Sequence, residues 1–339
     1  MIHLSPRPTD SIDGLQGLAG SEGLDEAIAV MDRLALGVRV DRVGTIAREH
    51  LAGGGKRMRA RLALAAVEAL GGERTPAAPW AAACELLHNA TLIHDDLQDG
   101  DAVRRGQPAV WARHGAAQAI NAGDLLLMLP TLAVGQLGVP DGTKWRLARA
   151  VVERAEATVR GQAYDLELLA SDRLTWHDWS TAARGKSGEL LALPVEGAAH
   201  LCGLSEATAR GLAEPFAVLG IVYQACDDRL DLYGDKGRGG PGSDLREGKV
   251  SVLVVEHLRR HPEDRQRLVE MLSAARDATS DDEVGWWIER FRVSGTVEAV
   301  DERIRSLERQ ILGDPRLRAV PDLHDVANTL LGFVRPVEA

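Results

Sequence analysis

The sequence predicts an all-α protein, a single-domain bundle of more than ten helices. Alanine and leucine dominate the composition and aromatic residues make up only 4% of the 339 residues. Ala and Leu favour helices, whereas strands need β-branched and aromatic side chains. Apolar residues also recur at the helical period, and no β-hairpin signal or fixed-period repeat is present.

Short polar breaks such as "GGERTP", "GVPDGT", "ASDRLT" and "CGLS" separate the periodic segments, which predicts where each helix ends. Residues 1–24 are rich in Gly, Ser, Pro and Asp and are expected to be a loose tail. No linker divides residues 25–339, so we expect one domain there. The expected helices span residues 25–52, 57–70, 77–101, 107–121, 123–137, 143–170, 175–185, 187–201, 205–233, 248–260, 263–277, 281–293, 295–311 and 321–335.

Composition also limits the function classes. A formal net charge of -10 argues against nucleic-acid binding, which needs a basic surface. Cys84, Cys202 and Cys226 are far apart in the sequence and are interpreted as reduced thiols. We see no signal peptide and no apolar run close to the roughly 18 residues of a membrane span. We therefore expect a cytoplasmic protein without a membrane span.

The stretch "LIHDDLQDGDAVRRG" ends an apolar segment with an acidic cluster. Asp95 and Asp99 are four residues apart and share one helix face, with Asp96 beside them. Like charges at this spacing repel one another unless a cation neutralises them. Carboxylate oxygens alone favour Mg²⁺ or Mn²⁺ over Zn²⁺. A single D-D-x-x-D is weak evidence, because a solvated acidic helix end has the same pattern.

The same spacing occurs a second time in "YQACDDRLDLYG", where Asp227, Asp228 and Asp231 follow another apolar helix. Two such clusters are difficult to explain as surface residues. If their helices face each other, six carboxylates surround one site that holds several divalent ions. Basic residues for a polyphosphate are also present. They are Lys56, Arg57, Arg59, Arg104, Arg105, Lys186 and Lys249.

The longest break, residues 234–248, mixes glycines with charged residues. It is either a solvated loop or a mobile lid over an anionic ligand. No strand precedes the glycines of "GGGKRMRA", so the sequence contains neither a Walker A loop nor a dinucleotide fingerprint.

Taken in order, the motifs "GGGKRMRA", "ELLHNATLIHDDLQDGDAVRRG", "AINAGD", "GQAYDLE", "GKSGEL", "YQACDDRLD" and "SDLREGK" resemble those of the trans-isoprenyl (polyprenyl) diphosphate synthase family. The likeness is to geranylgeranyl and farnesyl diphosphate synthases and runs from about Leu24 to the C-terminus. The resemblance implies an all-α isoprenoid synthase fold around a deep central cavity, and a homodimer. It also implies Mg²⁺-dependent head-to-tail condensation of isopentenyl diphosphate with an allylic diphosphate, with about three ions and Mn²⁺ as a substitute.

The resemblance implies roles for individual residues by motif position. Asp95, Asp99 and Asp227 would be the principal Mg²⁺ ligands, and Asp96, Asp228 and Asp231 ligands or close support. Arg104 would hold the allylic diphosphate. Lys56, Arg59, His88 and Arg105 would hold isopentenyl diphosphate. Lys186, Ser187 and Gln224 would lie beside the breaking C–O bond, and Lys249 would bind substrate after the lid.

Three positions depart from the family pattern. Ser187 replaces a frequent Thr and Tyr223 a frequent Phe, and both changes keep the expected chemistry. The lid usually opens with Gly-Lys. Here the segment is "DKGRGGPGSDL", so Lys236 or Arg238 must take the place of that lysine.

The side chains below Asp95 predict the product length. Thr91 and Ala90, four and five residues before it, are small, whereas short-product relatives place aromatic residues there. We therefore expect a product of C20, geranylgeranyl diphosphate, or longer. Leu87 and Met128 form the expected next layer and could stop the chain at C20.

Two other functions stay open. A class I terpene cyclase shares the helical fold and the first aspartate cluster, but usually carries an Asn/Ser/Glu motif at the second site and lacks the basic pocket. A non-catalytic synthase subunit typically loses one aspartate motif, and this chain has both.

Overall fold

The computed structural model describes residue 18 and residues 23–38, 40–170, 174–234, 241–275 and 278–335. The regular elements of these residues are almost entirely helical, which confirms the predicted fold class. In chain order the elements are α2 (Leu24–Leu36), α3 (Arg42–Ala52), α4 (Met58–Ala69), η1 (Thr75–Ala77), α5 (Ala78–Asp99), β1 (Val103–Arg104), β2 (Gln107–Pro108), α6 (Val110–His114), α7 (Ala116–Gly135), α8 (Asp141–Glu167), η2 (Leu168–Ala170), α9 (Trp176–Ala183), η3 (Arg184–Gly188), α10 (Glu189–Leu201), α11 (Glu206–Tyr233), α12 (Ser243–Arg246), α13 (Val252–Arg260), η4 (Pro262–Asp264), α14 (Arg265–Leu272), α15 (Asp281–Val293), α16 (Thr296–Gly313), α17 (Pro315–Arg318) and α18 (Pro321–Val334).

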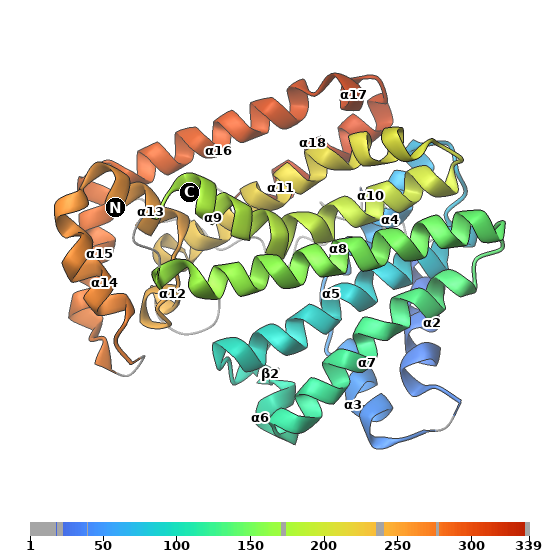
Figure 1. Ribbon diagram of the computed structural model, residues 1–339, viewed down its shortest axis with the longest axis horizontal. Helices are drawn as coiled ribbons and strands as arrows, with labels where there is room; N and C mark the ends of the chain where they lie inside the picture. Colours follow the sequence, from blue (N-terminus) through green and yellow to red (C-terminus); the bar gives the residue numbers. More distant parts are fainter. Residues whose placement is uncertain are drawn as a thin grey trace.

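Helix α10 lies at the centre of the bundle and is buried over nearly its whole length. It packs against α4, α5, α8 and α11, and Figure 1 shows it alongside the two long helices α8 and α11. Helix α7 covers the other side of α5. The two aspartate-bearing helices α5 and α11 are thus brought together around one central helix.

Several predicted helix limits were wrong because glycine allows backbone angles that end a helix. The expected helix 25–52 is two helices, α2 and α3, and the first ends before Gly37, where φ is +63°. The expected break near residue 122 lies instead at Gly115, so α7 begins at Ala116. The loose tail predicted for residues 1–24 falls almost entirely outside the described residues.

A two-stranded hairpin between α5 and α6 also departs from the prediction of no hairpin. Its turn residues Arg105 and Gly106 both have positive φ, at 52° and 73°. A tight two-residue turn of this kind needs positive φ at both positions, which glycine adopts easily and arginine does not. The hairpin places Arg104 and Arg105 beside the last turn of α5.

Glycines bring the segment η3 close to two neighbouring helices. A Cβ added at Gly185 would lie 2.5 Å from the Cα of Gly161, and one at Gly220 would lie 2.3 Å from the Cα of Gly188. The segment η3, which leads directly into α10, is therefore held against both α8 and α11 by backbone contact. This segment is a π-helix, a rare form that is frequent at functional sites.

One helix bears on the expectation that the chain has no membrane span. Among the described residues, α7 is long and apolar enough to cross a bilayer by length and composition alone. The prediction missed it because Asp124 interrupts its apolar run. Many core helices of globular proteins pass the same test, and α7 buries one face against α5.

Candidate active site

The ends of α5, η3 and α11 surround an acidic cavity of about 210 Å³. Asp95 and Asp99 line it from α5, and Asp227 and Asp228 line it from α11. Two ammonium groups lie among these carboxylates. Lys186 Nζ is 3.2 Å from Asp165 Oδ2, and Lys249 Nζ is 3.0 Å from Asp99 Oδ2. The two acidic motifs thus meet at one site, which is the condition set above for a shared cation site.

The charge balance of this cavity favours a bound cation. Burial raises the pKa of Asp95 to about 6, Lys186 opposes that shift, and Asp99 adds to it. An ionised Asp95 is therefore costly until positive charge comes closer. The donors are carboxylate oxygens, which suit Mg²⁺. Within the described part of the chain, no three His, Cys, Asp or Glu side chains already form a metal cluster.

The remaining predicted carboxylates support the cavity from behind. Asp96 is buried and accepts two 2.7 Å hydrogen bonds from Arg104 Nε. Asp231 is also buried and accepts a 3.0 Å hydrogen bond from the backbone N–H of Asp244. Neither residue lines the cavity. Asp96 therefore orients Arg104, and Asp231 holds α12, which lies within the glycine-rich break.

A hydrogen-bond chain fixes the two uncharged side chains of the site. Ser187 Oγ donates to Gln224 Oε1 at 3.0 Å, and Gln224 Nε2 donates to Asp228 Oδ1 at 2.9 Å. The backbone N–H of Val252 donates to the other Asp228 oxygen at 2.7 Å. Because an ionised carboxylate only accepts, Asp228 turns the amide of Gln224 so that its oxygen faces Ser187. Both residues line the cavity together with Lys186.

A second, basic cavity of about 700 Å³ adjoins the acidic one. Arg59, His88, Leu92, Arg104 and Tyr223 line both cavities, so the two are halves of one cleft. The other residues at the wall of the basic half come from the loop before α4 and its first turns, from α5, from the hairpin and from the end of α18. They include Lys56, Arg57, Arg105 and Phe333.

Two side chains of the basic half offer buried hydrogen-bonding atoms that are unused. His88 Nδ1 and Arg59 Nε have no hydrogen-bond partner among the described residues. Burial, and then Arg59 and Arg105, hold the pKa of His88 well below its usual value. His88 is therefore a neutral imidazole near pH 7. Buried polar atoms without partners are costly, so the arrangement favours an anionic or polar ligand here.

Sequence reasoning missed Glu85 as a residue of this cleft. Glu85 is buried, accepts a 3.2 Å hydrogen bond from the backbone N–H of Ala60 and lies 3.7 Å from Arg57. It therefore holds the start of α4 in place below the basic residues. Its position three residues before His88 was the available signal, since a carboxylate on an apolar helix needs a partner.

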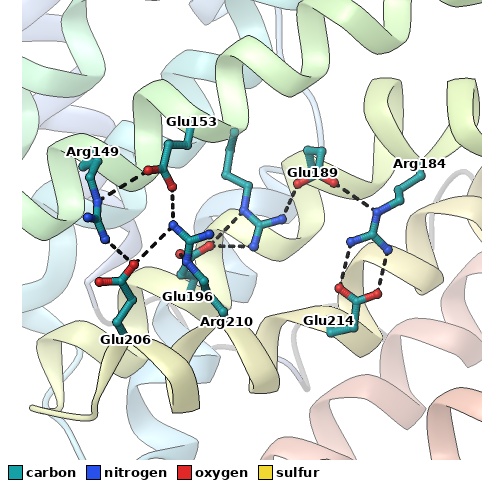
Figure 2. Close-up of polar contacts among 9 residues, drawn as sticks. Arg149, Glu153, Arg184, Glu189, Glu196, Glu206, Arg210 and Glu214 are labelled. Atoms are coloured by element: carbon teal, nitrogen blue, oxygen red, sulfur yellow. Dashed lines mark hydrogen bonds and ion pairs between the residues drawn. The ribbon is translucent and has the colours of Figure 1, made fainter.

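An ion-pair ladder between α8, α10 and α11 supports η3 from outside the cleft (Figure 2). Arg184, the first residue of η3, donates to both oxygens of Glu214 at 2.8 and 2.7 Å and lies 3.3 Å from Glu189. Arg154 joins Glu189 to the buried Glu196. Paired arginine–carboxylate contacts are geometrically restrictive. The ladder thus holds the segment that carries Lys186 and Ser187.

The residues predicted to set product length have different surroundings in the structure. Thr91 lines the acidic cavity, whereas Ala90 and Leu87 are fully buried and do not. Met128 was wrongly placed in the next layer, because its side chain is 62% exposed on the outer face of α7. Helix α7 turns its neighbours Leu126 and Leu129 toward the core instead.

The lid prediction is only partly covered by the structure. Lys236 and Arg238 lie outside the described residues. Lys249, at the end of the same break, lies 3.0 Å from Asp99 and 2.7 Å from Glu247. The break therefore ends in direct contact with the first aspartate cluster.

Comparison with known proteins agrees with this geometry. The polyprenyl synthetase family profile matches residues 41–290. A short chain isoprenyl diphosphate synthase of Methanothermobacter thermautotrophicus is 38% identical over 67% of this chain and 71% of its own. A geranylgeranyl diphosphate synthase of Saccharolobus solfataricus is 31% identical over 68% of this chain and 70% of its own.

Comparison with solved structures agrees with the comparison of sequences. The crystal structure of a polyprenyl synthetase from Streptomyces coelicolor superposes with a TM-score of 0.81 and 30% identity, over 95% of this chain and 98% of that one. The profile match, the relatives and the shared fold lead to one conclusion. The chain belongs to the polyprenyl synthetase family, and it is an enzyme of the prenyltransferase class.

Proposed function

We propose that this enzyme condenses isopentenyl diphosphate head to tail with an allylic diphosphate, giving an all-trans polyprenyl diphosphate of C20 or longer. The observation that carries the proposal is the two-part cleft. An acidic half with Asp95, Asp99 and Asp227 adjoins a basic half with Arg59 and His88. A reaction between two diphosphate substrates needs two diphosphate-binding sites, one in each half of the cleft.

The acidic half takes the allylic diphosphate. Asp95, Asp99 and Asp227 would hold Mg²⁺, with Mn²⁺ as a substitute, and the ions would act as Lewis acids on the diphosphate oxygens. Lys186 and Lys249 add positive charge at the same wall. Arg104, oriented by Asp96, presents its guanidinium beside them.

The basic half takes isopentenyl diphosphate. Lys56, Arg59 and Arg105 supply charge for its phosphates, and the neutral His88 supplies a hydrogen bond. The substrate's double bond would then lie toward the shared wall of the two halves.

In the reaction the allylic C1–O bond breaks and diphosphate leaves with the electron pair. The terminal CH₂ carbon of isopentenyl diphosphate forms the new bond to C1. A proton then leaves the carbon beside the resulting cation, and its electron pair becomes the new double bond. The oxygens of Ser187 and Gln224 face the region of the allylic cation and stabilise its charge. The departing diphosphate takes the proton, so no protein base is needed.

The outer faces of α7 and α8 support the proposed homodimer. Helix α8 exposes apolar side chains every seven residues, at Trp145, Val152, Val159 and Leu166, and α7 adds Met128. A second copy of the chain would cover this stripe. We expect sedimentation at twice the 36.5 kDa chain mass. A monomer at micromolar concentration would contradict the dimer.

Purified protein, Mg²⁺ and labelled isopentenyl diphosphate, tested with C5, C10 or C15 allylic primers, should yield a linear product of C20 or longer. Dephosphorylated products sized by chromatography provide the measurement. A clean stop at C15 would contradict the product length and leave the condensation intact.

The two alternatives make different predictions in the same assay. A terpene cyclase would convert one diphosphate to a cyclic hydrocarbon, and the basic half of the cleft would then have no ligand. A non-catalytic subunit would give no turnover with any primer. Condensation without cyclic product excludes both.

A further inference from the structure

We infer that Trp80 is the floor of the prenyl-tail path and stops chain growth at C20, an inference that rests on the proposed function. Trp80 lies in the first turn of α5, at the end opposite the aspartates, and is fully buried. Its indole Nε1–H donates to the carbonyl of Pro194 at 3.1 Å. The tryptophan thereby joins α5 to α10.

The α5–α10 seam leads from the cleft to this indole. On α5, Thr91, Leu87, Cys84 and Trp80 recur at steps of four, three and four residues, which places them along one helix face. Thr91 lines the acidic cavity at the upper end of this row, and the three residues below it are buried. The row therefore starts at the reaction site and ends at the tryptophan.

Helix α10 repeats the pattern from the other side. Leu190, Pro194 and Gly197 recur at steps of four and three residues. Leu190 lines the acidic cavity, whereas Pro194 and Gly197 meet the indole. A Cβ added at Gly197 would lie only 1.9 Å from the Trp80 ring, so the ring lies directly on that glycine.

The length of this seam corresponds to about three to five isoprenyl units. Trp80 is fifteen residues before Asp95, about 22 Å along a helix. Gly197 is ten residues after Ser187, about 15 Å. With four chain carbons per unit and C–C bonds of about 1.5 Å, one extended unit spans roughly 4 to 5 Å. A C20 tail of four units, roughly 16 to 20 Å long, lies within this range and would end near the indole.

Trp80 is better suited to stop the tail than Leu87 above it. A leucine side chain can change rotamer when a tail enters. The indole is held by its hydrogen bond to Pro194 and by its contact with Gly197, so it cannot move without breaking both. Trp80 therefore sets the end of the path.

Space for a longer tail exists beyond the indole. An open, mainly apolar cavity of about 590 Å³ lies at this end of the bundle, lined by the end of α4 and the residues that follow it up to Ala77, by Val139, and by the end of α10. Ala77, three residues before Trp80, and Leu201, four residues after Gly197, are part of its wall. The cavity thus lies at the same end of α5 and α10 as the tryptophan.

The test compares products of the full-length wild type, Trp80→Leu and Trp80→Phe with labelled isopentenyl diphosphate and a C15 primer. The wild type should stop at C20. Trp80→Leu should yield mostly C25 and longer products, with at least a tenfold rise in their share. Trp80→Phe keeps most of the ring volume and serves as the second variant in case Trp80→Leu fails to fold. It should yield a C20–C25 mixture.

The matched control is Trp287→Leu in α15, an equally buried tryptophan that lines neither half of the cleft. It should lower the melting temperature similarly and leave the product at C20. The inference is wrong if a folded Trp80 variant keeps the wild-type product, or if the wild type itself grows past C20. A wild type that condenses nothing would overturn the proposed function instead.

Discussion

Replacing Asp95 with asparagine should slow condensation about 1,000-fold, or about 4 kcal/mol of transition-state stabilisation. Asp95 lines the acidic cavity and interacts electrostatically with Lys186 and with Asp99, one turn further along α5. Asparagine keeps the shape of the side chain and loses the negative charge that would hold Mg²⁺. The measurement is kcat with saturating substrates at fixed Mg²⁺.

The same substitution should lower activity without lowering the stability of the folded protein at neutral pH. Burial raises the pKa of Asp95 from 3.8 to about 6, so the folded chain binds its proton more tightly than the unfolded chain. The metal-free wild type should therefore lose stability as the pH rises from about 4 through about 6. Asp95→Asn should remove that slope and melt no lower than the wild type at pH 7.

Two further measurements separate this effect from damage to the fold. Mg²⁺ together with inorganic diphosphate should raise the melting temperature of the wild type and not that of Asp95→Asn. Asp325→Asn, on the exposed face of α18, should behave as the wild type in both assays. An Asp95→Asn enzyme within tenfold of wild-type kcat would show that this carboxylate is not a metal ligand.

Replacing Gly220 with alanine should destabilise the protein by about 3 kcal/mol and slow condensation at least tenfold. The new Cβ would lie 2.3 Å from the Cα of Gly188, and backbone cannot move aside as a side chain can. Helix α11 must shift away from η3. Gln224 lies one turn further along α11, and its Oε1 is 3.0 Å from Ser187 Oγ. The shift of α11 would separate these two atoms.

The matched control is the same substitution at Gly285 within α15, where a Cβ would meet nothing within 4 Å. Gly285→Ala should raise the free energy of unfolding by about 0.5 to 1 kcal/mol, because alanine favours helix over glycine. Chemical denaturation and kcat provide the measurements. A Gly220→Ala protein as stable and active as the wild type would show that the two helices tolerate a wider separation.

Much of this protein is determined locally and was therefore readable in the sequence. Helical period and composition predicted the fold class, and the i, i+4 spacing predicted that Asp95 and Asp99 share a face. Helix limits failed where glycine decided them, as at Gly37 and Gly115. The Arg105–Gly106 turn was missed because arginine rarely adopts positive φ.

Only the tertiary structure decided which way each helix face turns. Spacing places Asp95 and Asp96 relative to their own helix, but packing against α7 and α10 decides that Asp95 faces the cavity and Asp96 faces Arg104. The same packing turns Met128 outward and places Glu85 under the basic residues. A periodic pattern specifies angles around one helix axis, whereas a site depends on the rotation of several helices about one another, which contacts far apart in the sequence determine.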